Sequence, residues 1–144
     1  MLSLLEEIME HHAVAPPEPS RLAATVQSII AAPDHCFLVA EVDGVGEARH
    51  LIGMCALVFS ISTWSASTAC ELQDVVVSGE HRREDVGRGL IAAAEEMAWA
   101  RGCSRLFLLA ESWNLGAHAF YRSLGMAEKT CLYFERDLRA SSAE

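Results

Sequence analysis

The chain has 144 residues, of which 51% are hydrophobic, so it can form one domain with a sizeable core. Its formal net charge is −9, and Lys129 is the one lysine among eleven basic residues, which argues against a general nucleic-acid binder with a broad basic surface. The longest apolar stretch, residues 51–59, is too short to span a bilayer, and the N-terminus is acidic where a signal peptide is basic. We therefore expect a cytoplasmic protein that does not enter a membrane.

The cysteines are odd in number and widely spaced, which matches neither a disulfide framework nor the CxxC spacing of a zinc site. We expect buried, reduced thiols and no metal. They are Cys36, Cys55, Cys70, Cys103 and Cys131.

Two helices are predicted at the start of the chain. Apolar residues recur at helical spacing from Leu2 to about His12, and again from Arg21 to Ile30, where a helix would end near Pro33. His11 and His12 close the first helix; adjacent histidines point in different directions, so we expect favourable charge at a helix C-terminus there and no metal site.

Three strands are predicted next, forming an antiparallel meander over residues 36–77. Residues 36–41 are rich in strand formers and are followed by the turn residues Asp43, Gly44 and Gly46. The strand at 51–64 is long, and its internal Gly53 indicates a bend or a bulge. A turn over 60–68 leads to a third strand at 69–77.

The remaining elements alternate between helix and strand. An apolar stripe from Leu90 to Ala98 predicts a helix that stops at Gly102, and residues 105–110 read as a strand buried on both faces. A helix over 115–124 ends at Gly125, a final strand is expected at 130–137, and the tail at 139–144 is expected to fray.

This order predicts an α/β fold with a mixed sheet and helices on its faces. We expect a single domain over residues 1–144. Its parts are the N-terminal helices at 1–35, the meander at 36–77, a core at 78–138 and the tail at 139–144.

The stretch from Leu72 to Leu90 joins a strand to a helix through an arginine-rich turn. The first backbone NH groups of a helix have no intrahelical partners, so this junction predicts an anion site, to which Arg82, Arg83 and Arg88 add cations suited to phosphate. Gly87-x-Gly89 matches neither a dinucleotide fingerprint nor a P-loop, and the glycines would equally allow tight packing of the helix on the sheet.

A second group of residues surrounds the helix predicted at 115–124. Helical spacing explains Ala117, Phe120 and Leu124 as core, whereas Asn114 and Tyr121 need either a functional role or a simple hydrogen bond. His118 is interpreted as a surface or capping residue.

Taken together, the two stretches resemble the GNAT superfamily of acyl-CoA-dependent N-acetyltransferases. That family carries an Arg/Gln-x-x-Gly-x-Gly/Ala loop between a strand and a helix, and here Val75–Val77, Arg82 and Gly87 match it. Its second signature is matched by Asn114, Ala117, Phe120-Tyr121 and Leu124-Gly125-Met126. The resemblance implies a mostly antiparallel, twisted sheet with an acyl-CoA cleft between splayed central strands.

The resemblance also implies roles for particular residues. Tyr121 would be the general acid that protonates the leaving thiolate, and Asn114 would position the pantetheine arm. The residues expected to bind acetyl-CoA are Val75, Val76, Val77, Arg82, Arg83, Glu84, Asp85, Val86, Gly87, Arg88, Gly89, Asn114 and Tyr121.

The loop departs from the family pattern at one position. Aligned on Arg82 and Gly87, it has Asp85 where the first glycine belongs; a register that starts at Glu84 keeps Gly87 and Gly89 but loses the leading Arg or Gln. In the preferred first register, Asp85 would tolerate a left-handed backbone and could cap the helix, in competition with a bound pyrophosphate.

The strand before the loop also departs from the pattern. Some relatives place a carboxylate, proposed as the general base, where this chain has Gln73, and an amide cannot accept the proton. Glu71 shares a strand face with Gln73 and is our first candidate, and Asp74 is the second. A surface carboxylate and a structural hydrogen bond, respectively, are the alternatives for the two residues.

The function expected is transfer of an acetyl group from acetyl-CoA to a primary amine of a small molecule or peptide, by direct attack in a ternary complex. The alternatives are a catalytically silent acyl-CoA-binding or regulatory domain, favoured by Gln73 and Asp85, and an unrelated phosphate-binding α/β protein. An edge strand such as that expected at 130–137 would allow a homodimer.

Overall fold

The computed structural model of the protein describes residues 1–44 and 49–138. It divides into two compact units, Met1–Leu109 and Ala110–Glu144. Gly46 of the predicted turn and the tail at 139–144 lie outside the described residues. The helices and strands are α1 (Leu2–His11), α2 (Pro19–Ala31), β1 (His35–Asp43), β2 (Arg49–Ser62), β3 (Ser67–Val77), the 3-10 turn η1 (Gly79–His81), α3 (Val86–Ala100), β4 (Cys103–Leu108) and α4 (Leu115–Ser123).

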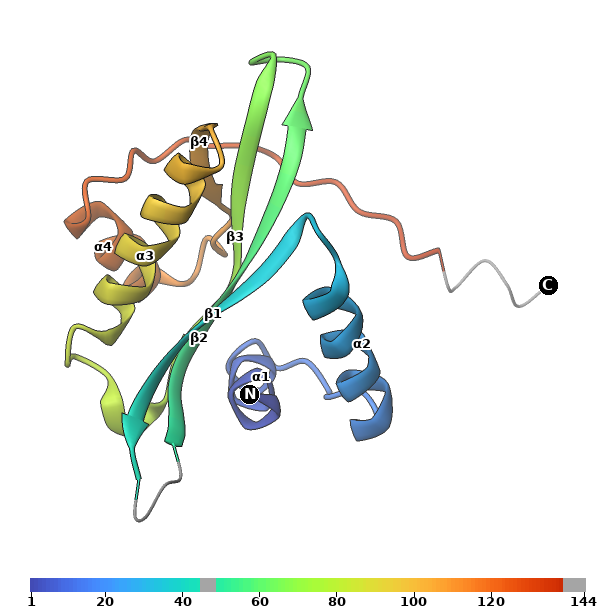
Figure 1. The fold of residues 1–144 in the computed structure, drawn as a ribbon, viewed down its shortest axis with the longest axis vertical. Coiled ribbons are helices and arrows are strands. Elements are labelled where there is room, and N and C mark those ends of the chain that lie inside the picture. The colour runs from blue at the N-terminus through green and yellow to red at the C-terminus, as the bar shows by residue number, and fades with distance from the viewer. Residues whose placement is uncertain (45–48, 139–144) are drawn as a thin grey trace. The chain divides into compact units, whose positions relative to one another are not determined.

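The first unit is built on a four-stranded sheet in the order β1-β2-β3-β4. β1, β2 and β3 pair antiparallel, which confirms the predicted meander, and β4 pairs parallel to β3. α1 and α2 lie on one side of this sheet and α3 on the other (Figure 1). The expectation of a mixed, mostly antiparallel sheet with helices on its faces is therefore confirmed.

The face under α1 and α2 is closed by apolar side chains from both helices. Their buried residues form one cluster with one residue from β2 and one from β3. α2 begins at Pro19, two positions before the predicted start, because Glu18 accepts a hydrogen bond from Arg21 N at 3.2 Å and proline is favourable in the first turn. The buried residues of the cluster are Leu4, Leu5, Leu22, Val26, Met54 and Val76.

The opposite face is covered by α3, which approaches β2 closely at Gly53. A side-chain carbon built on Gly53 would lie 3.1 Å from Val86 Cγ1 and 3.2 Å from Leu90 Cδ1, so any larger residue would push the start of α3 away. The pairing with β1 shifts register between Ala40 and Glu41, next to Gly53. The predicted bulge at this glycine is confirmed, and the structure adds helix packing as its second role.

Two predicted strands differ from the structure. Residues 130–137 form no strand, and Leu132, Tyr133 and Phe134 are exposed. The residues at 130–137 have strand propensity, but a strand also needs a partner edge, which propensity does not supply. β4 was expected to be buried on both faces, yet it is only partly buried because it is an edge of the described sheet.

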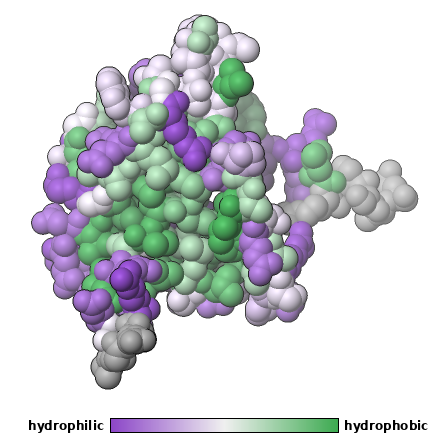
Figure 2. Space-filling model, viewed as in Figure 1, coloured by the Kyte–Doolittle hydropathy of each residue, from purple (hydrophilic) through white to green (hydrophobic). Residues whose placement is uncertain are grey.

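The other edge of the described sheet is β1, where Val39 and Val42 remain partly exposed. Figure 2 shows apolar side chains gathered at the middle of the face in view, where β1 and β2 run in Figure 1. Within the part of the chain that the structure describes, no helix has the length and apolar character needed to cross a membrane.

The cysteines are all free, and their burial varies. Cys55 and Cys70 are buried, and burial raises the pKa of each thiol to about 12, which keeps both protonated at neutral pH. The expectation of buried thiols holds for these two. It is wrong for Cys131, which is exposed in the unpaired segment at 130–137.

Candidate functional site

The C-terminal end of β3 has one free edge. The ladder between β3 and β4 runs from Thr68 opposite Cys103 to Leu72 opposite Leu108 and ends there. Among the described residues, 73–77 pair as strand only with β2. A strand edge without a neighbour offers backbone NH and C=O groups to an extended ligand with amide groups of its own. Val75–Val77, predicted to hold the pantetheine arm, lie in this stretch.

A bulge interrupts β3 at the start of this free edge. Met54 pairs with Val76 and Ala56 pairs with Gln73, so Asp74 and Val75 together lie opposite Cys55. Asp74 has a φ of 49°, in the left-handed region that few residues other than glycine adopt. Bulges re-aim side chains and are frequent beside active sites. The sequence carried no signal for this one.

The two base candidates lie in different environments. Glu71 is half-buried in the fully paired part of β3, between Val58 of β2 and Phe107 of β4. Asp74 is reached by water but surrounded by protein atoms, and this partial desolvation raises the pKa of its carboxyl. His12, the residue after α1, opposes the rise by its charge. Of the two, Asp74 has the environment expected of a base.

The loop after β3 is held in shape by two left-handed residues and one side-chain pair. Arg83 has a φ of 69° and Asp85 a φ of 60°, and His81 Nδ1 lies 2.9 Å from Glu84 Oε2. The left-handed backbone expected at Asp85 is confirmed. It stands where the family loop has its first glycine, a residue that adopts this conformation without strain.

The expectation that Asp85 could cap α3 is wrong. Its side chain makes no cap hydrogen bond and instead lies 3.4 Å from Arg88 Nε, with 86% of the side chain exposed. Capping side chains belong to residues with extended backbone, and the left-handed backbone of Asp85 directs its carboxylate elsewhere.

The backbone NH groups in the first turn of α3 have no hydrogen-bond acceptor within the helix. The first helical hydrogen bond runs from Gly89 N to Asp85 O at 2.9 Å, so the NH groups of Val86, Gly87 and Arg88 have no intrahelical acceptor. A side-chain carbon built on Gly89 would meet no atom within 4 Å beyond its chain neighbours and the backbone of its own helix, so tight packing on the sheet does not account for this glycine. Open NH groups with free space beside them suit an anion.

The three arginines of the loop differ in their contacts. Arg82 donates to Glu7 on α1 and to the backbone of β3, at 2.7 Å and 3.2 Å. The one ion pair of Arg88 within the described ranges is the long contact with Asp85. Arg83 pairs with no carboxylate among the described residues and is exposed. Arg83 and Arg88 are therefore the cations most available to phosphate.

In the second unit, Asn114 and Tyr121 are both placed by α4. Asn114 Oδ1 accepts a hydrogen bond from Ala117 N at 3.1 Å and so caps the helix. Tyr121 is half-buried, with its ring centroid 5.1 Å from that of Phe120. His118 Nε2 donates to Glu111 O, in the loop before α4, at 2.9 Å.

The structure thus brings together the predicted residues of the first unit, on the free end of β3, the loop and the start of α3. Sequence reasoning missed two neighbours of that site, Glu7 and His12. Glu7 lies on α1 and His12 directly follows it, and Glu7 is 75 positions from Arg82, so no local pattern could link them.

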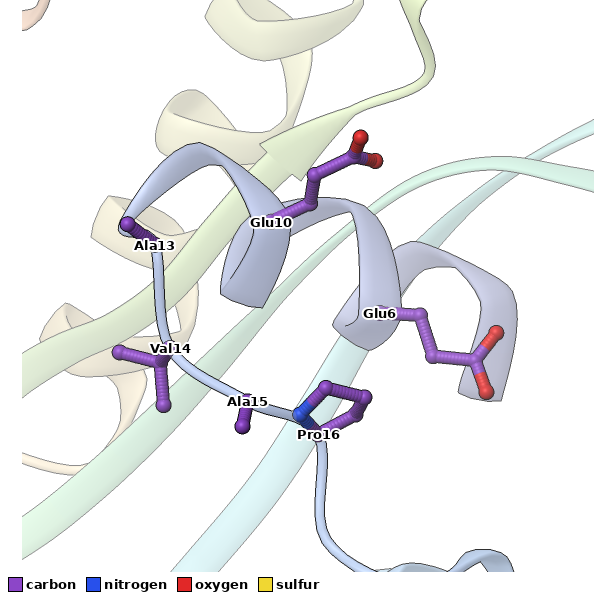
Figure 3. Close-up of a pocket in the computed structure, with 6 residues that line it drawn as sticks. All are labelled: Glu6, Glu10, Ala13, Val14, Ala15 and Pro16. Carbon is purple, nitrogen blue, oxygen red and sulfur yellow. The ribbon is translucent and has the colours of Figure 1, made fainter.

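A pocket of about 570 Å³ opens at the end of α1 (Figure 3). None of the predicted site residues lines it. Its lining consists of Glu6, Glu10, Ala13, Val14, Ala15 and Pro16.

Comparison with known proteins identifies the family. Residues 3–126 match the model of the acetyltransferase (GNAT) family. The chain is 31% identical over 109 residues to thialysine N-epsilon-acetyltransferase of Bos taurus, an alignment that covers 70% of this chain and 64% of that protein. The corresponding protein of Sus scrofa is 32% identical over 99 residues, which are 67% of this chain and 57% of that protein. The chain thus spans about three fifths of the length of these relatives.

Solved structures share the fold at lower identity. An aminoglycoside acetyltransferase from an uncultured soil metagenomic sample, in complex with sisomicin, has a TM-score of 0.78 at 20% identity, covering 95% of this chain and 85% of that one. Glucosamine-6-phosphate N-acetyltransferase from Arabidopsis thaliana has a TM-score of 0.72 at 16% identity, covering 88% and 85%. The family match, the relatives and the fold agree, and the chain belongs to the GNAT family of acetyltransferases.

Proposed function

We propose that this protein transfers an acetyl group from acetyl-CoA to a primary amine by direct attack in a ternary complex. The observation that carries the proposal is the free edge of β3 at residues 73–77, which the loop at 78–85 connects to a helix start with open NH groups. Such an arrangement suits a ligand with an amide-containing arm and a pyrophosphate, as acetyl-CoA has.

The proposed cofactor site follows the chain. Val75–Val77 hold the pantetheine arm by backbone hydrogen bonds, and the NH groups of residues 86–88 hold the pyrophosphate, with Arg83 and Arg88 as counter-ions. Glu84 and Gly89 belong to the same loop and helix start, and Asn114 remains the predicted contact to the pantetheine from the second unit.

The first chemical step is removal of a proton from the acceptor ammonium group. An alkyl amine has a pKa near ~10.4, so freeing its lone pair at pH 7 costs about 4 to 5 kcal/mol, and a base must take the proton. We assign that role to Asp74, ahead of Glu71. Asp74 lies at the start of the free edge, and the raised pKa of its carboxyl makes it a stronger base than an ordinary aspartate.

Acetyl-CoA supplies the thioester carbonyl that the freed amine attacks. A backbone NH of Val75–Val77 holds the negative oxygen that develops during attack. Tyr121 then donates its phenolic proton to the leaving thiolate as the carbon–sulfur bond breaks. The attacking nitrogen gives up its second proton, which returns through water to the Tyr121 phenolate, so that the products are the amide and free CoA thiol.

A primary alkyl amine is the acceptor class that we favour. The relative from Bos taurus is named for acetylation of the N-epsilon amine of thialysine, an amine at the end of a side chain. The formal charge of −9 also attracts a cationic acceptor. A homodimer and a cytoplasmic location remain predictions from the sequence.

The second candidate is a catalytically silent acyl-CoA-binding domain. Gln73 supports it because an amide stands where some relatives have a carboxylate, and Asp85 supports it because its charge lies beside the open NH groups.

Calorimetric titration of acetyl-CoA, followed by thiol release with a panel of primary amines, separates these functions. We expect binding and amine-dependent release. Binding without release on the whole panel supports the silent domain, and absence of binding contradicts both.

A further inference from the structure

Arg82 joins three parts of the first unit. Its Nη2 donates to Glu7 Oε1 on α1 at 2.7 Å, and its Nε donates to Val77 O at the end of β3 at 3.2 Å. Arg82 itself opens the loop that leads to α3. The guanidinium therefore fastens α1 to the point where the strand becomes the loop.

Glu7 is the less exposed partner of this contact and lies against the 3-10 turn η1. Its side chain is only 31% exposed, against 56% for that of Arg82. A side-chain carbon built on Gly79 of η1 would lie 3.6 Å from Glu7 Oε1, so the carboxylate lies directly against the 3-10 turn. We call the Glu7–Arg82–Val77 contact the clasp.

The other end of α1 reaches the proposed base. α1 ends at His11, and His12, the next residue, lies near enough to Asp74 to act on it by charge. Leu4 and Leu5 bury the apolar face of α1, but apolar contacts are not directional and leave the helix some freedom to rotate or slide. Two hydrogen bonds from one planar guanidinium, one to Glu7 and one to Val77 O, fix direction as well as distance.

We propose that Arg82 is a positioning residue for the amine acceptor: through the clasp it sets α1 across β3, and with it the surroundings of Asp74. The inference rests on the proposed function. It gives Arg82 a different role from Arg83 and Arg88, whose guanidinium groups are proposed to bind the pyrophosphate.

The test compares neutral variants of both partners in the full chain. Arg82→Gln and Glu7→Gln should each raise the amine KM about threefold to fivefold, the range of a partly exposed ion pair, and leave the Kd for acetyl-CoA within about twofold. Arg83→Gln should instead raise the Kd for acetyl-CoA and leave the amine KM nearly unchanged. Combining Glu7→Arg with Arg82→Glu re-forms the ion pair but removes the donor to Val77 O, so the amine KM should recover only in part.

A readout independent of catalysis is hydrogen exchange of the α1 backbone amides. Arg82→Gln and Glu7→Gln should speed exchange in residues 2–12, whereas Glu96→Gln, an exposed change on α3, should leave it as in the unaltered protein. Loss of acetyl-CoA affinity in Arg82→Gln together with a silent Glu7→Gln would overturn the clasp and return Arg82 to the phosphate site. If the unaltered protein releases no thiol with any amine, the proposed function fails. Hydrogen exchange of the α1 amides in the two variants still tests whether the clasp holds α1 in place.

Discussion

Replacement of Asp85 tests whether the helix start is the pyrophosphate site. The carboxylate of Asp85 caps no NH group of α3 and lies 3.4 Å from Arg88 Nε, so it holds a cation that a phosphate would use. A negative charge about 6 Å from a phosphate charge costs on the order of 0.7 kcal/mol in water, or roughly threefold in affinity, and freeing Arg88 adds to this. Asp85→Gly should therefore bind acetyl-CoA about threefold to tenfold more tightly.

The backbone effect of this change can be separated from the charge effect. Glycine at position 85 relieves the left-handed strain at φ 60°, which stabilises the fold, but it also raises the entropy of the unfolded chain, which destabilises it. Each contributes about 1 kcal/mol to the free energy of unfolding, so the two nearly cancel. Asp85→Asn keeps the side-chain carbon and removes the charge, so it is the matched control and should tighten binding to a similar degree. The assay is calorimetric titration at low and high salt, with the gain shrinking at high salt. A loss of more than about tenfold in either variant would refute the reasoning.

Three other changes test the rest of the site. Asp74→Asn should abolish most amine-dependent turnover; if Glu71→Gln does so instead, the base is Glu71. Because the folded-state pKa of Asp74 is raised, ionisation disfavours the fold, so Asp74→Asn should raise Tm at pH 7 and lose this advantage below the ordinary pKa of 3.8, where both states are protonated. Tyr121→Phe should lower kcat far more than acetyl-CoA affinity, and an unchanged kcat would remove Tyr121 from the mechanism. Gly53→Ala should cost about 1 to 3 kcal/mol in denaturant unfolding because its methyl group would lie 3.1 Å from Val86 Cγ1; full stability would contradict the packing described.

Local patterns predicted much of the fold. The meander, the helix at 86–100 and its stop at Gly102 follow from periodicity and from a glycine that the structure places at φ 70°. The left-handed backbone at Asp85 followed from aligning the loop on Arg82 and Gly87. Each of these features depends on residues close together in the chain.

The features that could not be predicted depend on residues far apart in the chain. The bulge at Asp74 arises from the register between β3 and β2, and the clasp joins Glu7 to Arg82 across 75 positions. The segment at 130–137 was predicted as a strand and forms none. It has strand-forming residues, but propensity alone does not supply a partner strand. Ranking Asp74 above Glu71 likewise required knowing where the ladder to β4 ends.

The central claim is that the free end of β3 and the start of α3 bind acetyl-CoA and deliver its acetyl group to an amine. The most direct measurement is mass spectrometry of a primary alkyl amine incubated with the protein and acetyl-CoA, alongside the thiol released. We expect one acetylated amine for each CoA thiol released, and neither product with Asp74→Asn. Thiol release without acetylated amine, or equal product from Asp74→Asn, would contradict it.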